Sequence, residues 1–260
     1  MLAHVRVNMS DGETVGVGIP ISVTFSRPVP AADREGVESW LRGQTSSGKR
    51  VAWSWVMGHS LLDGRRVDFR PDTAYWRSGT RVTLRLGSHG ARHFAIGRSL
   101  VTTVDAKTYA KTYLITYVMT YVMRYVIAVR TGGTAQRIPV ATGAPGTDTW
   151  NGTMVVTDEQ QKVCMDSRTV GLGDTHHGYC FWAVDLTTPG TYVHENPRAD
   201  AEVGHHNVTH GCVSLPSDGT ARRIYGQVRA GDVVTVTGAD KATVAPGNGY
   251  GYGYGYSDGK

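Results

Sequence analysis

The chain has 260 residues, of which 40% are hydrophobic and 19% charged, and a formal net charge of +5. These proportions exclude a globally disordered protein, and the length suits two ordinary domains. The lysines and arginines are scattered, so we expect no nucleic acid among its partners. No window reaches the roughly 18 apolar residues that a membrane span needs, so we expect no membrane span in this chain.

Short runs of alternating apolar and polar residues predict an all-β domain over residues 1–98. Turn residues separate these runs, and residues 34–41 read as a short helix capped by Asp33. Strands at such regular spacing are typical of a small β-sandwich. The runs lie at residues 19–25, 51–56, 66–69, 80–86 and 93–96.

A four-residue unit of the Thr-Tyr-Val-Met type is repeated five times over residues 108–127. A period of four contains the period of two that defines a strand, and Thr, Tyr and Val all favour strands. The repeat therefore reads as a lengthened strand. Its register is weakly specified, because a slip of four residues leaves nearly the same faces.

Residues 99–240 predict a second β-rich domain with one or two short helices. We expect a hairpin around 131–134, strands at 153–157, 179–186, 191–194 and 233–237, and a loop over 162–177. Ser217 is expected to cap a helix over 221–228. Residues 241–260 end in Gly-Tyr repeats and are expected to be a disordered tail.

Cys212 lies in a short window that also supplies bases and a flexible backbone. His194 precedes it by 18 positions and His210 by two, with Gly211 directly before it. An imidazole can take the proton of a thiol, and a glycine lets successive N–H groups point at an oxyanion. All ten histidines precede Cys212, which excludes a papain-like order in which the cysteine comes first.

Two other readings use the same region. The histidines and the thiol are possible zinc ligands, although their spacing matches no familiar pattern, and the third possibility is a region without a site. The candidate ligands are His194, His205, His206, His210 and Cys212. Three cysteines allow at most one internal disulfide, and Cys164 and Cys180 would pair only if the fold brings them close.

The residues Thr209-His210-Gly211-Cys212-Val213, preceded by Gly190-Thr-Tyr-Val-His194, resemble the signature of L,D-transpeptidases with a YkuD-type catalytic domain. Further runs are similar to those of actinobacterial members, and the region around 18–28 resembles the bacterial immunoglobulin-like domain that precedes the catalytic domain in those enzymes. These further runs are 138–143, 145–146, 151–152 and 165–167.

The resemblance implies acyl transfer on peptidoglycan stem peptides without a cofactor or a metal. Cys212 would attack the carbonyl of the third stem residue, release D-alanine, and pass the acyl group to an amine to form a 3→3 cross-link. It implies His194 as base, oriented by the carbonyl of Glu195, with His210 part of the motif and Gly211 and Cys212 as oxyanion donors. Substrate contacts are expected from Tyr192, Glu195, Thr209 and Ser214.

The same resemblance places the protein in the cell envelope, outside the cytoplasm, and names carbapenems as covalent inhibitors. Residues 1–20 show no signal peptide, so the export or anchor segment is expected to be absent from this sequence. A zinc-dependent hydrolase and a non-catalytic cell-wall-binding protein stay open as alternatives. Ser214 departs from the Asn or Arg that many members carry at this position.

Overall fold

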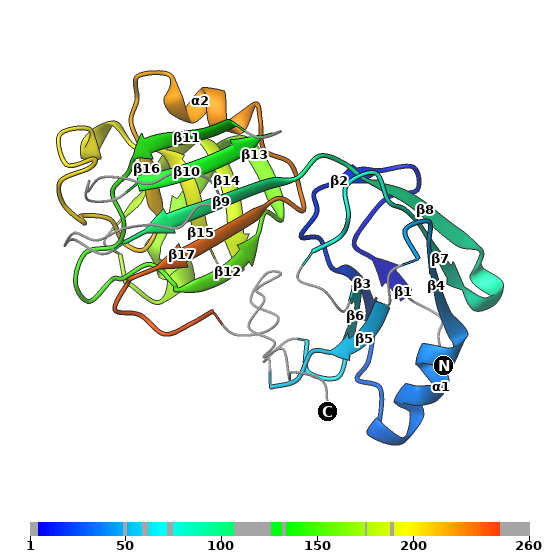
Figure 1. Ribbon diagram of the computed structural model, residues 1–260. Coiled ribbons are helices and arrows are strands. Elements are labelled where there is room, and N and C mark those ends of the chain that lie inside the picture. The colour runs from blue at the N-terminus through cyan, green and yellow to red at the C-terminus, as the bar shows by residue number, and fades with distance from the viewer. Residues whose placement is uncertain are drawn as a thin grey trace. The chain divides into compact units, whose positions relative to one another are not determined.

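The computed structural model describes residues 5–48, 51–58, 62–71, 75–106, 126–131, 134–174, 176–187 and 190–244. The chain forms two compact units, one of Met1–Ser99 with Ala230–Asp232 and one of Leu100–Arg229 with Val233–Lys260 (Figure 1). The predicted mainly β fold with few short helices is confirmed. Within the described ranges, no helix is both long enough and apolar enough to cross a membrane.

The first unit contains two four-stranded sheets, in which the five predicted runs form β3, β5, β6, β7 and β8. One has the order β1-β3-β6-β5, and the other has the order β2-β8-β7-β4. The predicted helix is present as α1, although the side chain of Asp33 makes no capping hydrogen bond. The elements are β1 (Val5–Val7), β2 (Thr14–Val15), β3 (Ile21–Phe25), η1 (Ala31–Asp33), α1 (Arg34–Trp40), β4 (Leu41–Thr45), β5 (Val51–Trp55), β6 (Arg66–Pro71), β7 (Arg81–Leu86), η2 (Gly87–His89) and β8 (Ala91–Ile96).

Aromatic side chains fill the centre of this unit. Phe69 is 1% exposed and lies between Trp53 and Trp76, with ring centroids 4.7 Å and 6.0 Å away. A Cβ on Gly43 would lie 2.0 Å from the Phe69 ring, so β4 passes this ring only because residue 43 has no side chain.

The second unit contains a five-stranded sheet, β11-β10-β9-β17-β12, and a four-stranded sheet, β13-β14-β15-β16. Buried aliphatic side chains from both sheets form one core cluster, and α2 packs against β14 and β15. The elements are β9 (Leu100–Asp105), β10 (Val126–Thr131), β11 (Thr134–Pro139), β12 (Gly152–Val155), β13 (Asp158–Asp166), η3 (Ser167–Val170), β14 (His177–Thr187), β15 (Thr191–Glu195), η4 (Pro197–Ala199), β16 (Val213–Leu215), α2 (Thr220–Tyr225) and β17 (Val233–Thr237).

Two predictions for this unit are wrong. The loop expected over 162–177 begins later, because β13 runs to Asp166 and pairs with β14, and η3 (Ser167–Val170) follows it. Ser217 does not cap α2: the helix begins after Gly219, and the Ser217 hydroxyl donates to Asp200 instead. Most of the 108–127 repeat and residues 245–260 of the tail lie outside the described residues.

One strand pair positions the residues around Cys212. β15 and β16 are parallel neighbours, with Val193 opposite Val213 and His194 opposite Ser214. Cys212 immediately precedes β16. The strand that carries His194 therefore runs beside the segment that carries the thiol, although 18 positions separate the two residues in sequence.

Candidate active site

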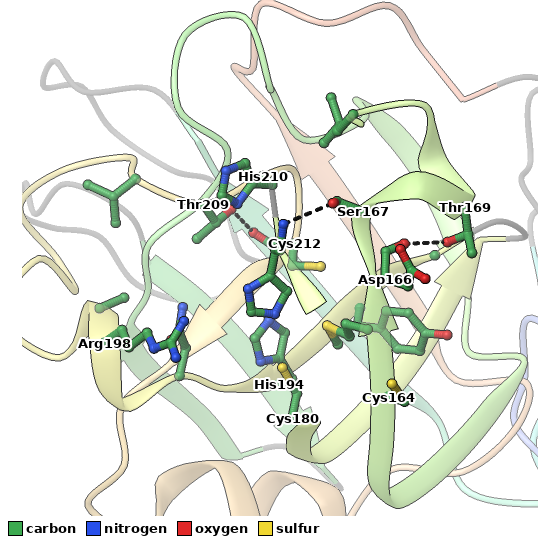
Figure 2. Close-up of a pocket in the computed structure, with 18 of the residues that line it drawn as sticks. Cys164, Asp166, Ser167, Thr169, Cys180, His194, Arg198, Thr209, His210 and Cys212 are labelled. Atoms are coloured by element: carbon green, nitrogen blue, oxygen red, sulfur yellow. Dashed lines mark hydrogen bonds between the residues drawn. The ribbon is translucent and has the colours of Figure 1, made fainter. Parts of the chain in front are cut away.

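A cavity of about 550 Å³ opens over β14 and β15 in the second unit. Figure 2 shows Cys212 and His194 near its centre, with Arg198 on one side and Asp166 and Thr169 on the other. Five of the eight predicted site residues line the cavity, namely Tyr192, His194, Thr209, His210 and Cys212. Glu195, Gly211 and Ser214 do not line it.

The Cys212 thiol is half-buried at the start of β16. Burial raises its pKa to about 12, and the neighbouring Cys180 and Asp185 act in the same direction. A backbone hydrogen bond from Tyr192 opposes this rise. The resting form of Cys212 is consequently a thiol, and a base has to remove its proton before or during attack.

His194 is buried, with 5% of its surface exposed, on the strand beside Cys212. Its Nδ1 lies 2.7 Å from the backbone carbonyl of Glu195, which makes Nδ1 the donor and leaves Nε2 as the acceptor of a residue that lines the cavity. Burial lowers the pKa of His194 to about 4, although the Glu195 carbonyl acts in the opposite direction. His194 is thus a neutral imidazole near pH 7 and is ready to accept a proton.

A network of hydrogen bonds holds the segment before Cys212. The Thr209 hydroxyl donates to the Cys212 carbonyl at 2.6 Å and accepts from the Gly211 N–H at 3.2 Å. The Thr209 carbonyl in turn accepts from the Thr147 hydroxyl at 2.8 Å. Gly211 has φ 109°, which a residue with a side chain rarely adopts. The Gly211 N–H therefore has an internal acceptor in this structure.

Ser214 lies beneath the cavity rather than in its wall. It is 0% exposed, and its hydroxyl accepts from the Asn196 side-chain amide at 3.0 Å. Asn196 itself lines the cavity. At this point Asn196 rather than Ser214 lines the cavity, and the Ser214 hydroxyl holds its amide.

Sequence reasoning missed the wall formed by the β13–β14 hairpin. Ser167 follows β13; its hydroxyl donates to the Gly173 carbonyl at 2.6 Å and accepts from the His176 N–H at 2.9 Å. Both Ser167 and His176 line the cavity. The only sequence signal here was the similarity of the run Met165-Asp166-Ser167 to actinobacterial enzymes.

Cys164 and Cys180 are free thiols that line the same cavity. The strand register pairs Cys164 with Tyr179 and Cys180 with Val163. The two cysteines are therefore not directly opposite each other in the hairpin, and both are free thiols.

The histidines between His194 and Cys212 do not converge on the thiol. His206 is exposed, and its Nδ1 lies 2.7 Å from Glu202. His210 is exposed as well, and it lines the cavity. Across the described ranges, no group of three or more His, Cys, Asp or Glu side chains is arranged to bind a metal ion.

Comparison with known proteins gives the same division of the chain into two parts. Residues 1–92 match the family model of a bacterial Ig domain, and residues 95–236 match the model of the L,D-transpeptidase catalytic domain. The second match covers more than half of the chain.

Curated relatives and solved structures lead to the same family. The chain is 29% identical over 244 residues to L,D-transpeptidase 2 of Mycobacterium tuberculosis strain CDC 1551, covering 87% of this chain and 53% of that one. It is 30% identical over 238 residues to L,D-transpeptidase 1 of strain H37Rv, covering 89% and 84%. A solved structure of the LD transpeptidase LdtMt1 in complex with imipenem aligns with TM-score 0.73 and 27% identity, covering 89% of this chain and 97% of that one.

The chain spans only about half the length of the first of these relatives. It covers most of the length of L,D-transpeptidase 1, however, and the family model covers the described cavity with His194 and Cys212. The predicted resemblance is therefore confirmed: this chain belongs to the L,D-transpeptidase family, with a bacterial Ig domain preceding its catalytic domain.

Proposed function

We propose that this protein is a peptidoglycan L,D-transpeptidase that forms 3→3 cross-links by cysteine acyl transfer. The observation that carries the proposal is that His194, a buried imidazole on β15, and Cys212, directly before the neighbouring strand β16, line the same cavity. Membership of the L,D-transpeptidase family supports the substrate class, which is the stem peptide of peptidoglycan.

In the first half of the reaction, the Cys212 sulfur attacks the carbonyl carbon of the third stem residue, a diamino acid. His194 Nε2 takes the thiol proton as the carbon–sulfur bond forms, and the carbonyl oxygen becomes an oxyanion. The carbon–nitrogen bond then breaks, the imidazolium gives its proton to the departing amine, and D-alanine leaves. The product is a thioester on Cys212.

In the second half, an amine of a neighbouring stem attacks the thioester. The neutral His194 accepts a proton from this amine, and the carbon–sulfur bond breaks to release the thiolate. The thiolate then takes the proton back from His194, so that the enzyme returns to its starting state. Because burial keeps both groups neutral at rest, proton transfer accompanies attack rather than preceding it.

The oxyanion needs N–H donors that are aligned before the reaction. We assign this role to the backbone N–H of Cys212. The Gly211 N–H joins it only by exchanging its present acceptor, the Thr209 hydroxyl. We assign substrate contacts to Tyr192 and Asn196 in the wall, with Thr209 holding the segment and Glu195 acting through its carbonyl.

We further propose residues 1–98 as an immunoglobulin-like spacer, residues 99–240 as the catalytic domain and residues 241–260 as a tail. Such an enzyme works on the cell wall, so we place it in the cell envelope, outside the cytoplasm.

Mass spectrometry of the protein after exposure to imipenem tests the proposal. We expect a single covalent adduct, mapped to Cys212, in the wild type and in Cys164→Ala, and none in Cys212→Ala. Cys164 is the matched control because it is an exposed free thiol in the same cavity. An adduct on Cys164 or Cys180, or an unmodified Cys212, contradicts the proposal.

A further inference from the structure

Arg198 is a charged group in the cavity for which the proposed acyl transfer has no role. It lies in the short helix η4, directly before Ala199, which is 2% exposed and anchors the turn. Its own side chain is exposed and lines the cavity. Figure 2 shows Arg198 set apart from Cys212 and His194, on the opposite side from Asp166.

Two carboxylates that follow Arg198 in sequence, Asp200 and Glu202, have other partners. Asp200 accepts from the backbone N–H of Ser217 at 3.0 Å and from its hydroxyl. Glu202 lies 2.7 Å from His206 Nδ1. Among the described residues, no carboxylate lies within salt-bridge distance of the Arg198 guanidinium. Its donors are thus directed at the cavity without an internal partner.

Further basic groups line the same cavity. His176, from the β13–β14 hairpin, and His210 both face it, and burial together with the charges of Arg198 and His210 lowers the pKa of His176. On the opposite wall, Asp166 is already paired with Arg168 at 2.6 Å. Glu202 also lines this cavity, but it already lies 2.7 Å from His206 Nδ1, so among the described residues no acid is paired with the Arg198 guanidinium, which favours an anionic ligand.

The shape of a guanidinium selects the kind of anion. Its planar fork of N–H groups matches the two oxygens of a carboxylate, and such charge-assisted pairs are stronger than neutral hydrogen bonds. In the proposed reaction the carbonyl of the third stem residue lies at Cys212. A carboxylate at the end of that residue's side chain would be several bonds away from this carbonyl. Arg198 is likewise set apart from the Cys212 thiol, so its position suits such a carboxylate.

We propose that Arg198 binds the side-chain carboxylate of a diaminodicarboxylic acid at the third position of the stem, and so makes the enzyme prefer the free acid over its amide. This inference rests on the proposed function, since it assumes that the third residue is attacked at Cys212. Arg198 is a specificity-determining residue here and takes no part in bond breaking.

The test compares synthetic tetrapeptide donors that differ only in this carboxylate. We expect the wild type to use the free acid with a kcat/KM at least about tenfold above that of the amide, because a hydrogen bond to a charged group has about this worth. Arg198→Gln brings the ratio to about one, and Arg198→Lys restores part of it. Arg42→Gln, an exposed arginine of the first unit, keeps the wild-type ratio.

A third donor, amidated on the terminal D-alanine, separates the two possible carboxylates. If Arg198→Gln changes the preference only at that position, the assignment to the third residue is wrong. Calorimetry with Cys212→Ala gives the same comparison without turnover, and equal dissociation constants for the free acid and the amide overturn the inference. Failure of the proposed function looks different, because the wild type and Arg198→Gln would then both lack an imipenem adduct on Cys212.

Discussion

The floor and the wall of the cavity are built in different ways. The floor consists of β15 and β16, whose side chains are mostly buried and whose backbones are paired. The wall consists of β13, η3 and η4, and β13 contains no buried residue. Strand pairing thus positions the groups to which we assign the reaction, whereas largely exposed segments position the groups to which we assign substrate contacts.

The causes of the pKa shifts also differ between the floor and the wall. In the floor, burial lowers the pKa of His194 to about 4 and raises that of Cys212 to about 12. In the wall, hydrogen bonds from Arg168 lower the pKa of Asp166 to about 2. Floor groups are therefore tuned by loss of water, and wall groups by partners that remain in contact with water.

The largest expected effect concerns the floor. His194→Ala should slow acylation of Cys212 by imipenem by about 10²–10⁴-fold, because a general base contributes about this much. Stopped-flow fluorescence or time-resolved mass spectrometry measures the rate, with His210→Ala as the matched control. An unchanged rate in His194→Ala, with a slow rate in His210→Ala, would transfer the role of base to His210.

The second effect is on stability and depends on pH. His194 stays neutral in the folded protein down to about pH 4, whereas an unfolded histidine titrates near 6.5. Between these values the unfolded chain binds more protons, so the free energy of unfolding falls by about 3 kcal/mol as the pH drops from 6.5 to 4. Urea titrations should show a smaller fall in His194→Gln.

Asp185 opposes this trend in both proteins. Burial raises its pKa to about 6, so its contribution to stability is present at low pH and is lost as the pH rises through that value. Because Asp185 is present in both proteins, its contribution drops out when the pH profile of His194→Gln is subtracted from that of the wild type. Identical pH profiles for the two proteins would show that His194 is not buried as a neutral imidazole.

The third effect tests the connection between floor and wall. Thr209→Val removes the hydroxyl that bonds to both the Cys212 carbonyl and the Gly211 N–H, at a cost of about 2 kcal/mol in the free energy of unfolding. Imipenem acylation should slow as well, since the oxyanion donors follow this segment. Thr209→Ser keeps the hydroxyl and should behave as the wild type. Equal stability of the Val and Ser variants would show that the two hydrogen bonds of the Thr209 hydroxyl do not stabilise this segment.

The smallest effect concerns the wall. Arg168→Gln breaks an exposed pair with Asp166, and exposed pairs contribute little. We expect no measurable change in the thermal unfolding midpoint and no change in the rate of acylation by imipenem. A clear loss of stability would show that the Asp166–Arg168 ion pair stabilises the wall, contrary to this expectation.

The two regions also differ in how well they could be predicted from sequence. The run 191–194 was expected to be a strand that ends at His194, and the resemblance of the motif with His194, Gly211 and Cys212 to the family pointed to the reacting groups. β13 was missed because Asp158–Asp166 consists mostly of polar residues and has no buried face, so neither periodicity nor burial marks it as a strand.

Arg198, Asn196 and His176 could not be assigned to the cavity for a related reason. Each lies outside a regular strand, and its direction depends on contacts between segments that are distant in sequence. Ser214 shows the converse case: its position in the motif suggested a substrate contact, but the parallel register buries it under Asn196.

The parallel pairing of β15 with β16 has a further consequence for how such enzymes diversify. The chain between two parallel neighbouring strands has to return to the end of the sheet at which the first strand began. Here residues 196–212 form this connection, and several of them line the cavity. This one continuous segment carries Asn196, Arg198 and Thr209 as well as the nucleophile itself. With the roles proposed above, we expect that exchanging residues 196–211 between relatives would transfer the proposed substrate contacts together, while the proposed base on β15 stays in place.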